Sequence, residues 1–260
     1  MLFRFCFCFL RCLFYYVLRI CNFSTTLMNS YRLLTRKYSS TALIENVGQY
    51  LKHCKLKKVN TTSTVFRGTL YEFHVKHLLE LKLHGKNMIR CGGSYDNGID
   101  IIGQWDLDPF YQISLKMNNV EHKIHNASLL HLLPGTSTKR PISLSNDIQL
   151  VVQCKNTKKR LGAAEVRQLS GILEYHKFNK KRTFMMMVSP HPLTVQGITQ
   201  LNKSSYPMIN LIVSPLKNEM DHYDYDNWEG GSLCSAYLNH AATKVLSGFR
   251  MEQQLLQLIK

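Results

Sequence analysis

Hydrophobic positions recur with a helical period in one long stretch of the chain. The stretch Arg67–His84 carries apolar side chains four positions apart, at Tyr71, Val75 and Leu79. This spacing places them on one face of a helix, so it predicts an amphipathic helix. Gly85 follows directly and suits the cap that ends such a helix. We therefore expect a well-formed helix at the start of the folded part of the chain.

Shorter apolar runs bounded by turn residues predict strands. These runs are Met88–Cys91, Ile99–Trp105, Ile148–Lys155, Thr183–Ser189 and Met208–Val213. Helices are expected over Gly162–Tyr175 and Leu193–Ser204, and again from Leu233 onward. Residues 39–60 predict a short helix or a linker, and residues 106–146 an elaborated loop with room for a hairpin. The order α-β-β-β-α-β-α-β predicts an α/β fold, a mixed sheet flanked by helices, with a C-terminal helical extension.

The composition describes a basic protein that can still form a core. The chain has 260 residues, with 33 Lys and Arg against 17 Asp and Glu, and 45% of its residues are hydrophobic. Six basic residues precede the first acidic residue, Glu45, which leaves a net charge of +10 for the remainder. Such an apolar content excludes a disordered polyelectrolyte. The basic remainder favours an anionic partner.

The cysteines exclude a disulfide-rich scaffold. Four of the eight lie within the first 21 residues. The others, Cys54, Cys91, Cys154 and Cys234, are far apart and form no Cys-x-x-Cys pair. This spacing fits neither a zinc site nor a disulfide framework, so we expect reduced and mostly buried thiols.

The first 38 residues are predicted to direct the protein into mitochondria. Residues 1–38 combine basic, hydroxyl and apolar side chains without a single carboxylate, which is typical of a mitochondrial transit peptide. Arg36 lies two residues before a cleavage point after Tyr38, so import into the matrix is expected. Alternatives stay open. The apolar stretch 2–21 could be a secretory signal or a retained membrane anchor, although three arginines interrupt it. Met28 could also be the true start.

Two short motifs carry the candidate chemistry. They are Gly98–Gly103, which contains Asp100, and Val151–Lys155, which contains Gln153. Because side chains alternate along a strand, Gln153 and Lys155 point to the same face. A carboxylate and an amide oxygen that converge at a sheet edge could hold Mg²⁺, a cation that prefers oxygen ligands. A nearby lysine could lower the pKa of an attacking water or neutralise phosphate charge.

These residues resemble the PD-(D/E)xK nuclease superfamily, and within it the branch of Mrr-like restriction endonucleases, in which Gln replaces Glu in the last motif. The family pattern is an acidic residue in the first helix, a Gly-x-Asp strand, a Gln-x-Lys strand and a following helix. The counterparts here are Glu72, Gly98-Ile99-Asp100, Gln153 with Lys155, and the helix that contains Glu165–Gly171. The resemblance implies a restriction-endonuclease-like fold over about residues 63–213.

The amino-acid sequence resembles a fungal mitochondrial family even more closely, the required for respiratory growth protein 7 family. This resemblance rests on Ser63–Phe66, Gly92-Gly93, Val152–Lys155 and Ser189–Thr194. It implies a mitochondrial protein needed for respiratory growth. The expected organisation is a transit peptide at 1–38, a linker or lead helix at 39–62, a nuclease-like domain at 63–215 and a mostly helical C-terminal extension at 216–260.

The superfamily resemblance also implies roles for individual residues. Asp100 would be a metal ligand and Gln153 a second ligand, while Lys155 would orient or activate water. Glu72 would be a supporting carboxylate that helps to bind the metal, and the implied cofactor of an active enzyme is Mg²⁺ or Mn²⁺. The gap of 53 residues between Asp100 and Gln153 is longer than the usual hairpin, so an insertion over 106–146 is implied.

Basic residues next to the motifs suggest a nucleic-acid surface. They form two runs, Lys158, Lys159 and Arg160 after the second motif, and Lys180, Lys181 and Arg182 before the next strand. Solvated loops explain them equally well, but the net positive charge favours contacts with phosphates. We expect a nucleic-acid partner, with DNA favoured over RNA, and a homodimer stays possible. The alternative is a nuclease-fold binding or scaffold protein without catalysis.

Overall fold

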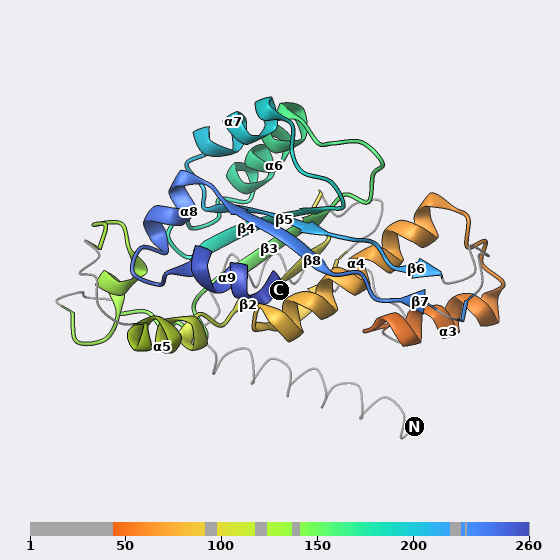
Figure 1. Ribbon diagram of the computed structural model, residues 1–260, viewed down its shortest axis with the longest axis horizontal. Helices are drawn as coiled ribbons and strands as arrows, with labels where there is room; N and C mark the ends of the chain where they lie inside the picture. The colour runs from red at the N-terminus through yellow and green to blue at the C-terminus, as the bar shows by residue number, and fades with distance from the viewer. Residues whose placement is uncertain are drawn as a thin grey trace, which may run out of the picture. The chain divides into compact units, whose positions relative to one another are not determined.

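A mixed six-stranded sheet organises the part of the chain that the computed structural model describes, residues 44–91, 98–117, 124–136, 141–218, 225–226 and 228–259 (Figure 1). The strands in sheet order are β1 (Gly85–Arg90), β2 (Ile101–Trp105), β3 (Gln149–Cys154), β4 (Thr183–Ser189), β5 (Met208–Val213) and β8 (Leu233–Leu238). β3, β4 and β5 are parallel to one another, and the other neighbours are antiparallel. The predicted α/β class with a mixed sheet is confirmed.

Helices cover both faces of this sheet. The main ones are α4 (Thr64–Lys82), α6 (Ala163–Tyr175), α7 (Val195–Lys203) and α9 (Met251–Ile259). Figure 1 shows α6 and α7 on one face and α4 with α9 on the other. The smaller elements are α3 (Val47–Lys57), α5 (Asp108–Lys116), a 3-10 turn (Leu129–Leu132), β6 (Lys217–Asn218), β7 (Trp228–Glu229) and α8 (His240–Val245). This layout is consistent with the restriction-endonuclease-like arrangement expected from the sequence.

Coverage on both faces explains the continuous apolar strands. Every residue of β4 is buried, as expected for a central strand with helices on both sides. Trp105 at the end of β2 is fully buried, and its indole N–H donates to the carbonyl oxygen of Leu83 at 2.8 Å. Its ring also meets the edges of Phe184 and Phe110. β4 and β5 begin and end at the predicted residues.

Of the two alternatives expected over residues 39–60, the short helix is confirmed, and the insertion expected as a loop also contains a helix. Val47–Lys57 is helical because the side chain of Asn46 accepts the N–H of Gln49 and caps the first turn. In the insertion, α5 follows β2 closely, and Pro109 lies in its first turn, where proline is tolerated. No hairpin occurs in the described residues of the insertion.

The expected helix from Leu233 is wrong. Leu233–Leu238 forms β8, which pairs antiparallel with β5 and lies at the edge of the sheet. The strand is buried at both ends and partly exposed between them, so its apolar residues support an edge strand better than a helix. Helices follow only from His240. Leu238, Phe249 and Leu255 join the same core cluster as α4 and the central strands, so this C-terminal segment packs on the sheet.

The cysteines and the absence of a membrane-spanning helix in the described ranges can be compared with the sequence predictions. Cys54, Cys91, Cys154 and Cys234 are free thiols, of which the first two are buried and Cys234 is exposed. No helix within the described ranges is long and apolar enough to cross a membrane. The predicted transit peptide and the stretch 2–21 lie outside the described residues.

Candidate functional site

The candidate site lies where β2 begins and β3 ends, which are neighbouring points because the two strands are antiparallel. Asp100 precedes β2 and makes two contacts with β3. Its backbone N–H donates to the carbonyl oxygen of Val152 at 3.0 Å, and its Oδ2 accepts the backbone N–H of Cys154 at 2.6 Å. These bonds lie on either side of Gln153 in the sequence, so Asp100 is fixed beside that residue.

Gln153 is buried with an acceptor that lacks a partner. Its side chain is only 1% exposed, and its Oε1 has no hydrogen-bond partner within the described residues. Gly98 packs closely against it. A Cβ on Gly98 would lie 3.1 Å from Nε2 of Gln153 and 2.6 Å from Cδ1 of Ile172, and φ is +79° there. Gly98 therefore permits a close approach that other residues would block.

An orphaned amide oxygen of this kind needs an explanation. Leaving a buried acceptor unpaired costs about 1–3 kcal/mol, so native proteins keep few of them. A bound cation or water at Oε1 of Gln153 would remove that cost. Together with the Asp100 carboxylate, the amide oxygen fits the preference of Mg²⁺ for oxygen ligands.

Lys155 lies one residue beyond β3 and is half-buried. Its backbone N–H donates to the carbonyl oxygen of Val188 at 2.8 Å, so the lysine continues the line of the strand. Its positive charge interacts electrostatically with the Glu165 carboxylate at the start of α6. Backbone N–H groups, including that of Gly162, lower the pKa of the Glu165 carboxyl first, and the Lys155 ammonium lowers it further. Glu165 thus caps its own helix, with Oε2 accepting the Gly162 N–H at 2.8 Å.

Glu72 lies on α4 and is paired with an arginine that the sequence motifs did not indicate. Nε of Arg90 lies 2.6 Å from Oε2 of Glu72, with the two side chains only 21% and 15% exposed. Nη2 of the same arginine donates to Oγ1 of Thr69 at 3.3 Å, and its guanidinium lies 5.1 Å from the ring centre of Phe73. Arg90 ends β1, 18 residues after Glu72, and no local sequence pattern links the two.

The Cys154 thiol lies near the four charged side chains of the site, which are Asp100, Glu72, Arg90 and Lys155. Burial raises its pKa well above the usual range, and the carboxylates of Asp100 and Glu72 raise it further. The cations of Arg90 and Lys155 act in the opposite direction. The structure thus gathers Asp100, Glu72 and Lys155 around the end of β3, with two negative charges opposed by two positive ones.

The donor set does not amount to a complete cage for a metal. No group of three or more His, Cys, Asp and Glu side chains in the described ranges is arranged to hold an ion. Mg²⁺ does not require one, because it keeps several waters and binds through one or two carboxylates plus substrate phosphates. Asp100 and Gln153 could supply two ligands. Asp96, an acidic residue four positions before Asp100, lies outside the described residues.

The two basic runs lie at opposite ends of the sheet. The run 158–160 is exposed and follows β3 at the end where Lys155 lies. The run 180–182 precedes β4, which is parallel to β3, so it lies at the other end, about 20 Å away for a strand of this length. Lys180 also pairs with Glu174 at 2.8 Å. The run 158–160 is therefore the one beside the site, and the role of the run 180–182 in binding nucleic acid stays a prediction.

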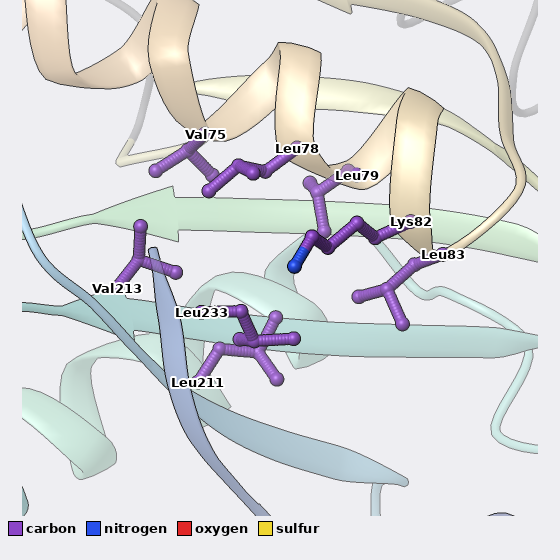
Figure 2. Close-up of a pocket in the computed structure, with 8 residues that line it drawn as sticks. All are labelled: Val75, Leu78, Leu79, Lys82, Leu83, Leu211, Val213 and Leu233. Atoms are coloured by element: carbon purple, nitrogen blue, oxygen red, sulfur yellow. The ribbon is translucent and has the colours of Figure 1, made fainter. Parts of the chain in front are cut away.

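A small pocket elsewhere does not compete with this site. It lies between α4, β5 and β8, as Figure 2 shows. Its lining is apolar apart from one lysine: Val75, Leu78, Leu79, Lys82, Leu83, Leu211, Val213 and Leu233. The cavity measures about 10 Å³, room for one water at most. Nζ of Lys82 donates to the carbonyl oxygen of Leu258 in α9 at 3.2 Å, so this lysine joins two helices.

Comparisons with known proteins identify relatives of the chain. A family model described as "Required for respiratory growth protein 7" matches residues 63–246. Proteins named "Required for respiratory growth protein 7, mitochondrial" are similar over most of their length. The one from Vanderwaltozyma polyspora is 34% identical over 205 residues, 75% of this chain and 80% of the relative. The one from Saccharomyces cerevisiae is 33% identical over 204 residues, 74% and 83% respectively. No solved structure matches the chain significantly.

Proposed function

The chain belongs to the required for respiratory growth protein 7 family, and on that premise we propose that it hydrolyses phosphodiester bonds of nucleic acid in the mitochondrial matrix. Its relatives are mitochondrial proteins required for respiratory growth. Respiration depends on genes that mitochondria themselves encode. A nuclease that maintains or helps to express that genome would therefore account for the requirement.

One observation carries this proposal. The Asp100 carboxylate is fixed beside Gln153, whose buried Oε1 has no partner within the described residues. Lys155 follows two residues later, and the exposed run 158–160 leads away from it. An acceptor pair, a lysine and an exposed basic segment in this order would suit a phosphodiester substrate.

The side chains divide the work between them. Asp100 and Gln153 would hold Mg²⁺, which when bound polarises the phosphate and lowers the pKa of a bound water. Lys155 would neutralise charge that develops on the phosphate oxygens. The run 158–160 would contact neighbouring phosphates, which positions a strand without reading its sequence. DNA is the first substrate we propose and RNA the second.

A second candidate function rests on a specific observation. Asp100 already accepts a backbone N–H from β3, and Glu72 is paired with Arg90. Both carboxylates therefore also stabilise the fold. A family member could keep them for that reason alone and bind nucleic acid without cleaving it.

We expect purified protein to cleave DNA in Mg²⁺ or Mn²⁺, and Asp100→Asn to lower the cleavage rate by at least about 100-fold. Asparagine can still accept the Cys154 N–H but has no charge for a cation, so the fold should persist. Lys155→Ala should lower the rate to a similar extent. Plasmid, linear and single-stranded DNA and a structured RNA should be compared by gel electrophoresis.

The matched control is Lys181→Ala, which removes an exposed lysine at the opposite end of the sheet. It should leave the cleavage rate within about twofold of wild type, with folding of every variant checked by circular dichroism. Cleavage that survives both Asp100→Asn and Lys155→Ala would contradict the catalytic assignment. Binding without cleavage, weakened by loss of Lys158 and Lys159, would favour the second candidate.

A further inference from the structure

Arg90 is the least expected charge at the candidate site, and its contacts define its position. Its Nε pairs with Oε2 of Glu72 at 2.6 Å, and its Nη2 donates to Oγ1 of Thr69 at 3.3 Å. Its planar face lies over the ring of Phe73, 5.1 Å from the centre. Glu72, Thr69 and Phe73 all belong to α4, so one helix holds the guanidinium from three directions.

This pairing changes the charge balance of the site. Among the described residues, Asp100 and Glu72 supply two negative charges near the end of β3, and Arg90 and Lys155 supply two positive ones. Gln153 adds a neutral oxygen where a carboxylate would add a charge. A divalent cation gains from carboxylates only to the extent that other cations do not already neutralise them. The described charges of the free protein therefore offer little net attraction to such an ion.

We propose that Arg90 is a positioning residue: its ion pair keeps the Glu72 carboxylate from binding the metal. The metal then binds tightly only together with a substrate phosphate. This inference rests on the proposed function. A phosphate brings the negative charge that the site lacks and oxygen atoms that can complete the coordination of Mg²⁺. Nucleic acid and metal then strengthen each other's binding, and the coupling is reciprocal.

A purely structural role for the Arg90–Glu72 pair makes the opposite prediction. If the pair only joined α4 to β1, its loss would lower stability and leave metal affinity unchanged. If Arg90 withholds Glu72, its loss should raise metal affinity in the free protein, although stability falls. Few structural substitutions improve ligand binding, so metal affinity separates the two roles.

The first experiment measures Mn²⁺ binding to the full-length chain without nucleic acid, by electron paramagnetic resonance. Arg90→Gln should bind Mn²⁺ about tenfold more tightly than wild type, because a nearby positive charge is gone and Glu72 is released. The double variant Arg90→Gln with Glu72→Gln should lose that gain. The matched control, Arg182→Gln, makes the same change at the far end of the sheet and should leave the affinity unchanged.

The second experiment needs no variant, so it decides the question even if Arg90→Gln fails to fold. Mn²⁺ affinity of the wild type should rise at least about tenfold when a DNA duplex with non-hydrolysable phosphorothioate linkages is bound. Equal affinity with and without the bound duplex would overturn the proposal. So would an Arg90→Gln protein, folded by circular dichroism, whose Mn²⁺ affinity equals that of wild type or does not depend on Glu72.

The outcomes also separate this inference from the proposed function. A Glu72-dependent gain in Arg90→Gln, in a protein that neither binds nor cleaves nucleic acid, would support the role of Arg90 and refute the nuclease. Cleavage that requires Asp100 and Lys155, with Mn²⁺ affinity indifferent to Arg90, would support the nuclease and refute the role of Arg90.

Discussion

Replacing Asn239 with alanine should lower the free energy of unfolding by about 4 kcal/mol. The side chain is fully buried, and its four hydrogen bonds all go to the backbone. Oδ1 accepts the N–H groups of Met208 at 3.0 Å and Ala242 at 2.8 Å, while Nδ2 donates to the carbonyl oxygens of Leu201 and Tyr206, both at 3.0 Å. Alanine would remove one partner from each of these four backbone groups in the interior, and of the four the Leu201 carbonyl oxygen would still accept the N–H of Ser204. It would also remove the cap of α8, which contributes about 1 kcal/mol.

Urea unfolding followed by circular dichroism measures this loss directly. The control is Asn156→Ala, because Asn156 is exposed and, within the described residues, makes one long hydrogen bond of 3.3 Å to the carbonyl oxygen of Arg67. That change should cost well under about 1 kcal/mol. A loss below about 1 kcal/mol for Asn239→Ala, with an unchanged denaturant slope, would contradict this prediction. It would mean that water replaces the side chain and that the four hydrogen bonds of Asn239 add little to the free energy of unfolding.

The sequence predicted those elements whose environment is uniform along their length. β4 and β5 lie between two layers of helices, so nearly all of their positions are buried and most are apolar, and the runs Thr183–Ser189 and Met208–Val213 stand out. β8 lies at the sheet edge, where exposed residues such as Cys234 interrupt the apolar positions. Its identity as a strand depends on β5, which lies far away in the sequence. Local periodicity does not record such a partner.

The candidate site divides in the same way. Asp100, Gln153 and Lys155 belong to two compact motifs, and pairing of β2 with β3 brings those motifs together. The bond between Arg90 and Glu72 joins a strand to a helix across 18 residues, and no local pattern marks it. The direction of the strands likewise determines which basic run lies beside the site. Because β3 and β4 are parallel, the run after β3 and the run before β4 lie at opposite ends of the sheet.

The protein should lose about 3 kcal/mol of stability between pH 6.5 and pH 4 through His74 alone. This imidazole is only 4% exposed, and its Nε2 lies 3.1 Å from the carbonyl oxygen of Gly231. Burial lowers the pKa of His74 to about 4, the bond to Gly231 raises it in part, and the nearby His77 lowers it. An unfolded histidine has a pKa of about 6.5. Between these two values the unfolded chain binds a proton that the folded protein does not, so acidification favours unfolding.

His74→Gln separates this contribution from other acid effects. The variant should be less stable than wild type at pH 7.5, because it disturbs a buried contact, but its stability should fall less between pH 6.5 and pH 4.5. Urea unfolding at intermediate pH values gives both slopes, and His240→Gln, at an exposed histidine, should follow the wild type. Parallel pH profiles for wild type and His74→Gln would mean that the pKa of His74 is the same in the folded and unfolded states, which would contradict the lowered pKa. A wild type that loses less stability than His74→Gln on acidification would mean that the contact with Gly231 is a charged hydrogen bond and that His74 stabilises the fold in acid.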